Sequence, residues 1–368
     1  MKKRFLIIAV LAAIAVSCGP AASLKRAAVE ECDIENPGTR KFLEEVDYTR
    51  DTAYTLSFVK DYREQYGAND KPLPVTIAWT GAPAARIVLS TTPNFKEIID
   101  LPGSASPAEI YNLIPGVDYY YKVLGREGVV LKTGCVRPVG PLRWINGIVE
   151  NVRDLGGWQA DGGHIAYGKL YRGAQLSSSR MTEGAKDIFS NQLHIGVDLD
   201  LRGIKTSEAH YGPVIEKAEY LKLPVEKNMG RGTGNTQELY QQAIRAIIGW
   251  LGEGKAVYFH CAGGADRTGT LAFLIEALLG VSESDLSKDY ELTTLARTNT
   301  RLRNYRATEK ETHILYELVT YLRQFGYPEV SSINELVLNW ATTRHSETVD
   351  PLSYEEIDRL REYLIVKD

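Results

Sequence analysis

The chain has 368 residues, which is long enough for two ordinary domains with additional segments. Hydrophobic residues make up 44% of it and charged residues 24%, close to a globular average, which excludes a disordered, collagen-like or coiled-coil protein. The 43 Lys and Arg residues against 47 Asp and Glu give a net charge of −4, so nucleic acid is not expected as the main partner. The four cysteines exclude a disulfide-rich small scaffold, and the six histidines form no metal-binding motif, so we expect no metal and no cofactor.

The N-terminus has the pattern of an export signal. Basic residues at positions 2–4 precede an apolar run over 5–16 that is too short to span a bilayer comfortably. The small residues before Cys18 resemble a bacterial lipobox, in which the cysteine becomes the lipidated first residue of the mature protein, although Ala15 stands where leucine is usual. We expect residues 1–17 to be removed and Cys18 to hold the protein to a bacterial membrane, on its periplasmic or surface face. Ordinary cleavage without lipidation is the alternative.

Two segments separate this signal from the C-terminal part of the chain. Residues 18–70 are expected to form a tether followed by one or two helical stretches, because apolar residues recur at approximately helical spacing. Residues 71–137 contain short β-type runs separated by Pro and Gly. Outside the cytoplasm, Cys32 and Cys135 could form a disulfide between these segments, or they could be two buried thiols.

The segment 71–137 resembles a fibronectin type III domain. Trp79 lies in an early predicted strand, and Pro115-Gly116 precedes Tyr119 as in the corner of that fold where a tyrosine hydroxyl returns to the backbone. The resemblance implies a small all-β sandwich that acts as a spacer or a docking surface. Because the segment is short for this family, an edge strand is either trimmed or recruited from before residue 70.

Residues 144–368 have an α/β pattern. Residues 196–202 alternate like a strand that ends at a loop, 235–251 place apolar residues on one helical face after an Asn235 cap, and 256–260 read as a buried strand. A second helix is expected from Thr268. We therefore predict a multi-domain protein in which the β-sandwich precedes a domain with a mostly parallel central sheet flanked by helices.

The segment His260-Cys-Ala-Gly-Gly-Ala-Asp-Arg-Thr-Gly269 joins the buried strand to the second helix. A strand that turns sharply through glycines into a helix points several backbone N–H groups into one concavity, at the positive end of a helix dipole. In such a place the pKa of the Cys261 thiol is depressed, and the planar guanidinium of Arg267 can hold two phosphoryl oxygens. An ordinary turn with a buried cysteine would explain any one of these residues, but not the full set in this context.

This segment resembles the signature loop of the cysteine-dependent protein tyrosine phosphatases, in particular the bacterial branch with a Gly-x-Asp-Arg-Thr-Gly loop. Further motifs of that branch extend the resemblance over about residues 148–295. They are Asn151-Val-Arg-Asp-Leu-Gly-Gly157, Gly168-Lys-Leu-Tyr-Arg-Gly173, Asp200-Leu-Arg202, Leu279-Gly-Val281 and Asp289-Tyr290.

The resemblance implies a two-step hydrolysis without a metal. Cys261 attacks phosphorus to form a phosphocysteine, which water then hydrolyses. Thr268 helps the sulfur to leave, and His260 orders the loop and tunes the thiolate. The residues expected to bind the phosphate are Ala262, Gly263, Gly264, Ala265, Asp266 and Arg267.

The general acid is less clearly specified. Asp266 is the first candidate, Asp200 at the end of its strand is the second, and Glu226 is the only carboxylate in the stretch where many relatives place an acid on a mobile loop. Asp266 could instead brace Arg267, and Asp200 could pair with Arg153 or Arg172. Arg153 and Asp154 themselves are expected to be structural.

The sequence thus predicts an enzyme, with phosphorylated protein as the first candidate substrate. A phosphoinositide or inositol-phosphate substrate is the alternative, which Ala265 disfavours because the branch commonly has a lysine there. A binding protein with a decayed phosphatase domain is a second alternative. The glycine-rich stretch 229–234 is expected to be a flexible loop or a lid, and the arginines between 297 and 306 a solvated face.

Overall fold

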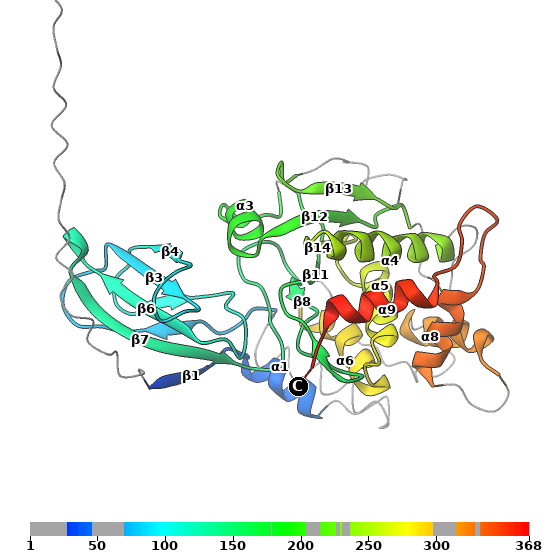
Figure 1. The fold of residues 1–368 in the computed structure, drawn as a ribbon, viewed down its shortest axis with the longest axis horizontal. Helices are drawn as coiled ribbons and strands as arrows, with labels where there is room; N and C mark the ends of the chain where they lie inside the picture. Colours follow the sequence, from blue (N-terminus) through cyan, green and yellow to red (C-terminus); the bar gives the residue numbers. More distant parts are fainter. Residues whose placement is uncertain are drawn as a thin grey trace, which may run out of the picture.

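The computed structural model describes residues 28–45, 70–177, 179–203, 214–225, 229, 236–296, 314–327 and 332–367. These residues form a β domain, an α/β domain and a segment that contacts both (Figure 1). Within the described residues, no helix combines the length and the apolar character needed to cross a membrane.

The β domain consists of two sheets. A five-stranded sheet has the order β1-β7-β6-β3-β4, and β2 pairs with β5 in a second sheet. The strands are β1 (Val29–Asp33), β2 (Val75–Ile77), β3 (Arg86–Ser90), β4 (Ile99–Pro102), β5 (Ala108–Ile110), β6 (Tyr119–Leu124) and β7 (Val130–Val139). Both sheets contribute to one apolar core, which is the arrangement of a sandwich.

The tyrosine corner predicted from the sequence is present. The hydroxyl of Tyr119, at the start of β6, accepts a hydrogen bond from the Ile114 N–H at 3.0 Å. Trp79 is buried at 8% exposure in the same core, but it lies two residues beyond the end of β2 and not within a strand as predicted. These features agree with the predicted sandwich, whose membership of the fibronectin type III family stays a prediction.

The segment before residue 70 is more than the expected tether. Strand β1 pairs in parallel with the end of β7, so the sandwich recruits an edge strand from before residue 70. Helix α1 (Pro37–Glu45) follows and packs on the α/β domain, where Phe42 is fully buried in the main core. In addition, the Trp144 indole donates to the Thr39 hydroxyl at 3.1 Å. The predicted boundary at residues 70–71 is therefore wrong, because this segment belongs to both domains.

Cys32 and Cys135 are both free thiols. They lie on the neighbouring strands β1 and β7, but Cys135 is opposite Val29 whereas Cys32 is opposite Pro138. This offset of three residues along parallel strands places the two Cα atoms beyond the reach of a disulfide. Of the two possibilities left open by the sequence, the structure has the pair of thiols.

The α/β domain is built on a mostly parallel sheet in the order β13-β12-β14-β11-β8, as predicted. Strand β14 lies at its centre, parallel to both β11 and β12, and only β8 runs antiparallel to its neighbour. The strands are β8 (Arg153–Asp154), β11 (Leu170–Gly173), β12 (Ile195–Asp200), β13 (Glu219–Lys222) and β14 (Ala256–His260). A small separate sheet contains β9 (Gln159–Ala160), β10 (Gly163–Ile165) and β15 (Ile365–Val366).

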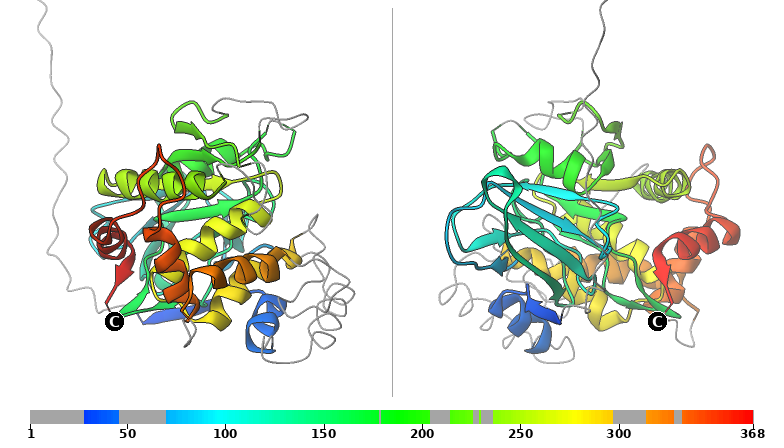
Figure 2. Two further views of the ribbon diagram at one scale, coloured as in Figure 1. Left: turned by 90° about the vertical axis from the view of Figure 1, so that its right-hand side faces the viewer. Right: turned by 60° about the vertical axis from the view of Figure 1, so that its left-hand side comes forward.

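Helices surround this sheet (Figure 2). Helix α5 is buried along nearly its whole length because it contacts α4, α6, α7 and α8. The helices are α3 (Ala185–Asp187), α4 (Thr236–Gly252), α5 (Asp266–Leu278), α6 (Glu283–Leu292), α7 (Ile314–Leu322), α8 (Ile333–Thr342) and α9 (Tyr354–Leu364). The central position of β14 and α5 places the loop between them in the middle of the domain.

Candidate active site

The loop from Cys261 to Arg267, here called the Cys261 loop, connects β14 to α5. Strand β14 is fully buried and ends at His260, so Cys261 lies at the carboxyl edge of the parallel sheet, where α/β proteins bind ligands. Gly264 has a φ of +66°, and a Cβ there would come within 2.3 Å of the Gly173 backbone carbonyl. Only glycine fits this turn.

The carbonyl groups of residues 262–264 point away from the centre of the loop. The Gln175 N–H donates to Ala262 O at 3.2 Å, and the Asn151 side chain donates to Gly263 O and Gly264 O at 3.0 and 3.2 Å. In a trans peptide the N–H points opposite to the preceding C=O, so the N–H groups of residues 263–265 face the loop interior. Together with the N-terminus of α5, they form an anion-binding concavity.

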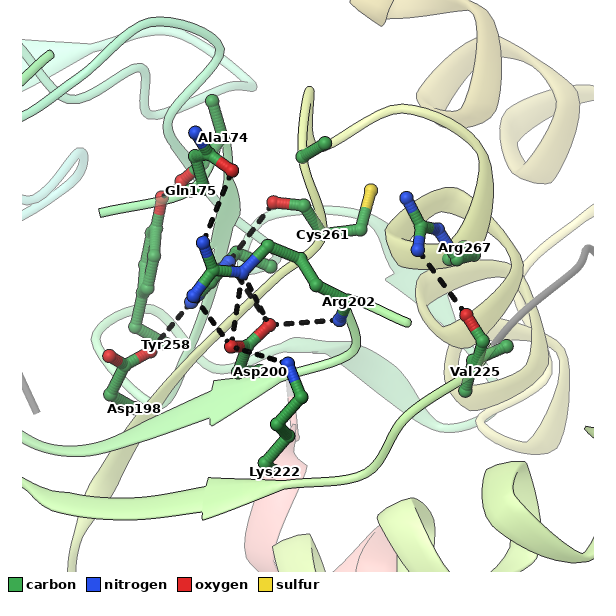
Figure 3. Close-up of polar contacts among 12 residues, drawn as sticks. Ala174, Gln175, Asp198, Asp200, Arg202, Lys222, Val225, Tyr258, Cys261 and Arg267 are labelled. Carbon is green, nitrogen blue, oxygen red and sulfur yellow. Dashed lines mark hydrogen bonds and ion pairs between the residues drawn. The ribbon is translucent and has the colours of Figure 1, made fainter. Parts of the chain in front are cut away.

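The Cys261 thiol lies at this concavity and is 3% exposed. Burial alone would raise its pKa, but the positive charge of Arg267 and polar contacts from Thr268 and the Ala265 N–H lower the pKa to about 7. Figure 3 shows the sulfur and the Arg267 guanidinium on the same side of the loop. A thiol in this environment is substantially ionised at neutral pH and is a nucleophile.

Arg267, in the first turn of α5, is partly buried. One guanidinium nitrogen donates to the Val225 carbonyl at 3.3 Å, in the segment that follows β13 (Figure 3). This contact ties the Cys261 loop to the stretch that leads to Glu226. Glu226, the carboxylate predicted there, lies outside the described residues, as do Cys18, residues 230–234 and the arginines between 297 and 306.

His260 is buried behind the nucleophile. One ring nitrogen lies 3.0 Å from the Cys261 carbonyl oxygen and the other 3.0 Å from Asp198. Burial disfavours the charged imidazole, but the Asp198 and Asp200 carboxylates outweigh it and raise the pKa of His260. The ring therefore contacts the backbone of the nucleophile and not the phosphate concavity.

Asp200 is held by several donors and is fully buried. The Arg202 guanidinium donates to its carboxylate at 2.7 Å, and Lys222 lies 3.5 Å away (Figure 3). The Tyr220 hydroxyl donates to the same carboxylate at 2.8 Å. Burial opposes ionisation, yet the Arg202 contacts hold the pKa of Asp200 well below its usual range. The expected pairing with Arg153 or Arg172 is wrong, because Arg202 occupies the carboxylate.

Asp266 is the last residue of the loop before Arg267 and is partly exposed. It stands in the first turn of α5, next in sequence to the guanidinium. Of the three acid candidates, Asp266 thus begins α5, Asp200 is engaged by Arg202, and Glu226 lies outside the described residues.

Two buried arginines support the loop from behind, and both pair with Asp289 of α6. Arg153 donates to the Asp289 carboxylate at 2.9 Å, and Arg172 bonds to its second oxygen while also donating to Gly264 O at 3.2 Å. Asp154 instead pairs with Arg143 at 2.8 Å. These roles agree with the structural part expected for Arg153 and Asp154. Asp289 and Asn151 belong to motifs that are visible in the sequence, but the sequence does not show the contacts they make.

Comparison with known proteins relates this chain to phosphatases. Residues 147–348, more than half of the chain, match the tyrosine phosphatase family. A predicted tyrosine-protein phosphatase of Cupriavidus necator is 30% identical over 166 residues, which span 39% of this chain and 59% of that protein.

Among solved structures, the catalytic core of the PP-IP phosphatase SIW14 of S. cerevisiae covers 37% of this chain and 78% of its own, with 14% identity and a TM-score of 0.28. The family match is the broadest of these findings and includes the whole Cys261 loop. The chain therefore belongs to the tyrosine phosphatase family.

Proposed function

We propose that the protein is a phosphatase that hydrolyses phosphomonoesters, with protein phosphotyrosine as its substrate. The observation that supports this most is the combination in the Cys261 loop: a thiol with a pKa of about 7 beside inward-facing backbone N–H groups and a guanidinium. These groups can stabilise the three equatorial oxygens of a phosphoryl group in transfer. The positive charge that the reaction needs comes from the protein itself, so no metal takes part in the proposed reaction.

The first step forms a bond between the Cys261 sulfur and phosphorus. The bond from phosphorus to the ester oxygen breaks, and that oxygen leaves with a proton from a general acid. In the second step a water molecule loses its proton to the same carboxylate and attacks phosphorus. The sulfur leaves as a thiolate, stabilised by Thr268 and Arg267.

We assign the general acid to Asp266 in this proposal. An acid must be protonated before the step, and Asp200 is kept ionised by Arg202 and is fully buried. Asp266 is the first residue of α5 and precedes Arg267 directly, which supports this assignment. Asp200 then acts as a brace for Arg202 and for the end of β12.

The proposal also includes the export and the lipid anchor predicted from residues 1–18. Support for it comes from the sequence alone: the basic residues, the short apolar run and Cys18. A protein anchored in this way would act on phosphoproteins at the cell envelope.

The proposed function is tested with the full mature protein and para-nitrophenyl phosphate. We expect turnover that EDTA leaves unchanged and that Cys261→Ser abolishes, because a serine hydroxyl is not ionised at neutral pH. Thr92→Ser, in the β domain, serves as a control for the effects of mutagenesis and purification on activity. Loss of activity with EDTA, or full activity in Cys261→Ser, would contradict the mechanism. A comparison of phosphotyrosine peptide, phosphoinositide and inositol hexakisphosphate then decides the substrate class.

A further inference from the structure

We propose that Asp70 is a positioning residue for the Cys261 loop and acts through Asn151. This inference rests on the proposed function of that loop. Asp70 lies outside the family match at 147–348 and immediately before the β-sandwich. The segment that joins the two domains would thus help to shape the phosphate site.

Asp70 is held in a defined place. Its carboxyl group is 6% exposed and accepts a hydrogen bond from the Asn151 backbone N–H at 2.6 Å. The residues that follow Asp70 are bonded to the β1–α1 segment. Asn36 donates to the Lys71 carbonyl at 2.9 Å, and the Leu73 N–H donates to Ile34 O at 2.8 Å. The β1–α1 segment therefore sets the position of the Asp70 carboxylate.

Asn151 has a left-handed backbone, with a φ of +59°, and is fully buried. Asparagine tolerates this conformation better than most residues other than glycine, and neighbouring hydrogen bonds stabilise it further. A short hydrogen bond from its own N–H to a carboxylate is a contact of this kind.

The side chain of Asn151 contacts the Cys261 loop directly. Its amide nitrogen donates to Gly263 O and Gly264 O, and its amide oxygen accepts from Arg153 at 2.9 Å. The outward direction of those two carbonyls is what turns the following N–H groups toward the phosphate site. A change in the backbone of Asn151 would rotate its side chain and release both carbonyls.

The far side of Asp70 faces a pocket of about 390 Å³ that Asn146, Glu150 and Arg180 also line. Water can enter a space of this size and solvate the Asn151 N–H when the carboxylate is removed. An Asp70→Ala variant is therefore expected to fold, with the effect appearing at the loop.

The test measures the thiol and not only turnover. The rate of Cys261 alkylation by iodoacetamide is followed against pH, and vanadate binding is measured as a phosphate-like probe, in full-length wild type, Asp70→Ala, Asn151→Ala and the double variant. Asp118→Ala is the matched control, because Asp118 is an acidic residue of the β domain that pairs with Arg137 at 2.7 Å. Asp70→Asn retains an oxygen acceptor, and Tm values monitor folding.

We expect a wild-type alkylation midpoint of about 7. In Asp70→Ala the midpoint should rise by about one pH unit and vanadate binding should weaken about tenfold, because loop N–H groups are misdirected. Asp70→Asn should lie closer to wild type, and Asp118→Ala should match it. Because Asp70 acts through Asn151, the double variant should equal Asn151→Ala alone.

Two results would overturn the inference: an unchanged alkylation midpoint and vanadate affinity in folded Asp70→Ala, or strictly additive effects in the double variant. Both readouts are independent of turnover. If the wild type binds vanadate but hydrolyses no phosphate ester, the proposed function fails while the role of Asp70 is still decided by the same measurements.

Discussion

A buried thiol ordinarily resists ionisation, so the Cys261 environment depends on a balance between two effects. Removal from water raises the pKa, whereas the Arg267 charge and the contacts at the start of α5 lower it, and the second effect is larger. Asp200 shows the same balance, because Arg202 keeps a fully buried carboxylate ionised. At both residues a nearby guanidinium decides the protonation state.

The assignment of the acid to Asp266 predicts a dependence on the leaving group. In Asp266→Asn, kcat/KM for aryl phosphates with poor leaving groups should fall by about 100-fold, and much less for good ones, because a good leaving group needs no proton in the first step. The measurement is a plot of log(kcat/KM) against the leaving-group pKa. A steeper slope in Asp200→Asn than in Asp266→Asn would assign the acid to Asp200 instead.

Helix α6 is connected to strands β8 and β11 through a single carboxylate. Asp289 pairs with Arg153 and Arg172, and all three side chains are at most 2% exposed. Glu276 of α5 lies close to this group, and burial raises its pKa well above the usual value, whereas at Asp289 the two arginines outweigh burial and lower the pKa. The surroundings thus favour the neutral form of Glu276 and the ionised form of Asp289.

This arrangement predicts that two conservative substitutions change the free energy of unfolding by very different amounts. Asp289→Asn should lower the free energy of unfolding by about 3–5 kcal/mol, because two buried cations lose their counter-ion. Glu276→Gln should change it by less than about 1 kcal/mol, because burial favours the neutral form of Glu276, which glutamine resembles in shape and charge. Urea denaturation at pH 7 measures both.

The pH dependence has a defined sign. The pKa of Asp289 is lower in the folded state, so its contribution is complete above the unfolded value of about 3.9 and is lost as the pH falls through the folded one. Wild type and Asp289→Asn should therefore converge in strong acid. Equal stability of the two at pH 7 would contradict this account of the pair.

Elements with a clear local pattern were predicted closely, whereas long-range partners were not. The buried strand 256–260 coincides with β14, and the helix expected over 235–251 is α4 at Thr236–Gly252. Both have a hydrophobic period that the local sequence displays. The partner of Arg153 is 136 residues away in the chain, and nothing in the local sequence indicates such a distance.

At the scale of the whole molecule, the segment before residue 70 joins the two domains. Its strand β1 completes the edge of the sandwich, and its helix α1 contributes Phe42 to the α/β core. The sequence left the recruited strand open as a possibility. The helix was expected, but its docking was not, because a helical period shows that a face is apolar without showing what covers it.

Because α1 packs on the α/β domain, we expect this domain to be less stable to unfolding when it is isolated. A fragment of residues 144–368 lacks Phe42 and the Thr39 hydroxyl that bonds to Trp144, and it should unfold with about 3 kcal/mol less free energy than the full chain. A fragment starting at residue 28 keeps both contacts and should match the full chain. Chemical denaturation compares the three, and equal stability of the short fragment would show that α1 is dispensable.

The β1–α1 segment also has a consequence for the order of events during synthesis. It leaves the ribosome early, but β1 needs residues 135–139 as its neighbours and α1 packs against Trp144 and α6 at Glu283–Leu292. Strand β1 can therefore pair as soon as residue 139 has emerged, whereas α1 finds its partner α6 only after residue 292 has been made. The two halves of this segment thus dock at different times, the strand early and the helix late.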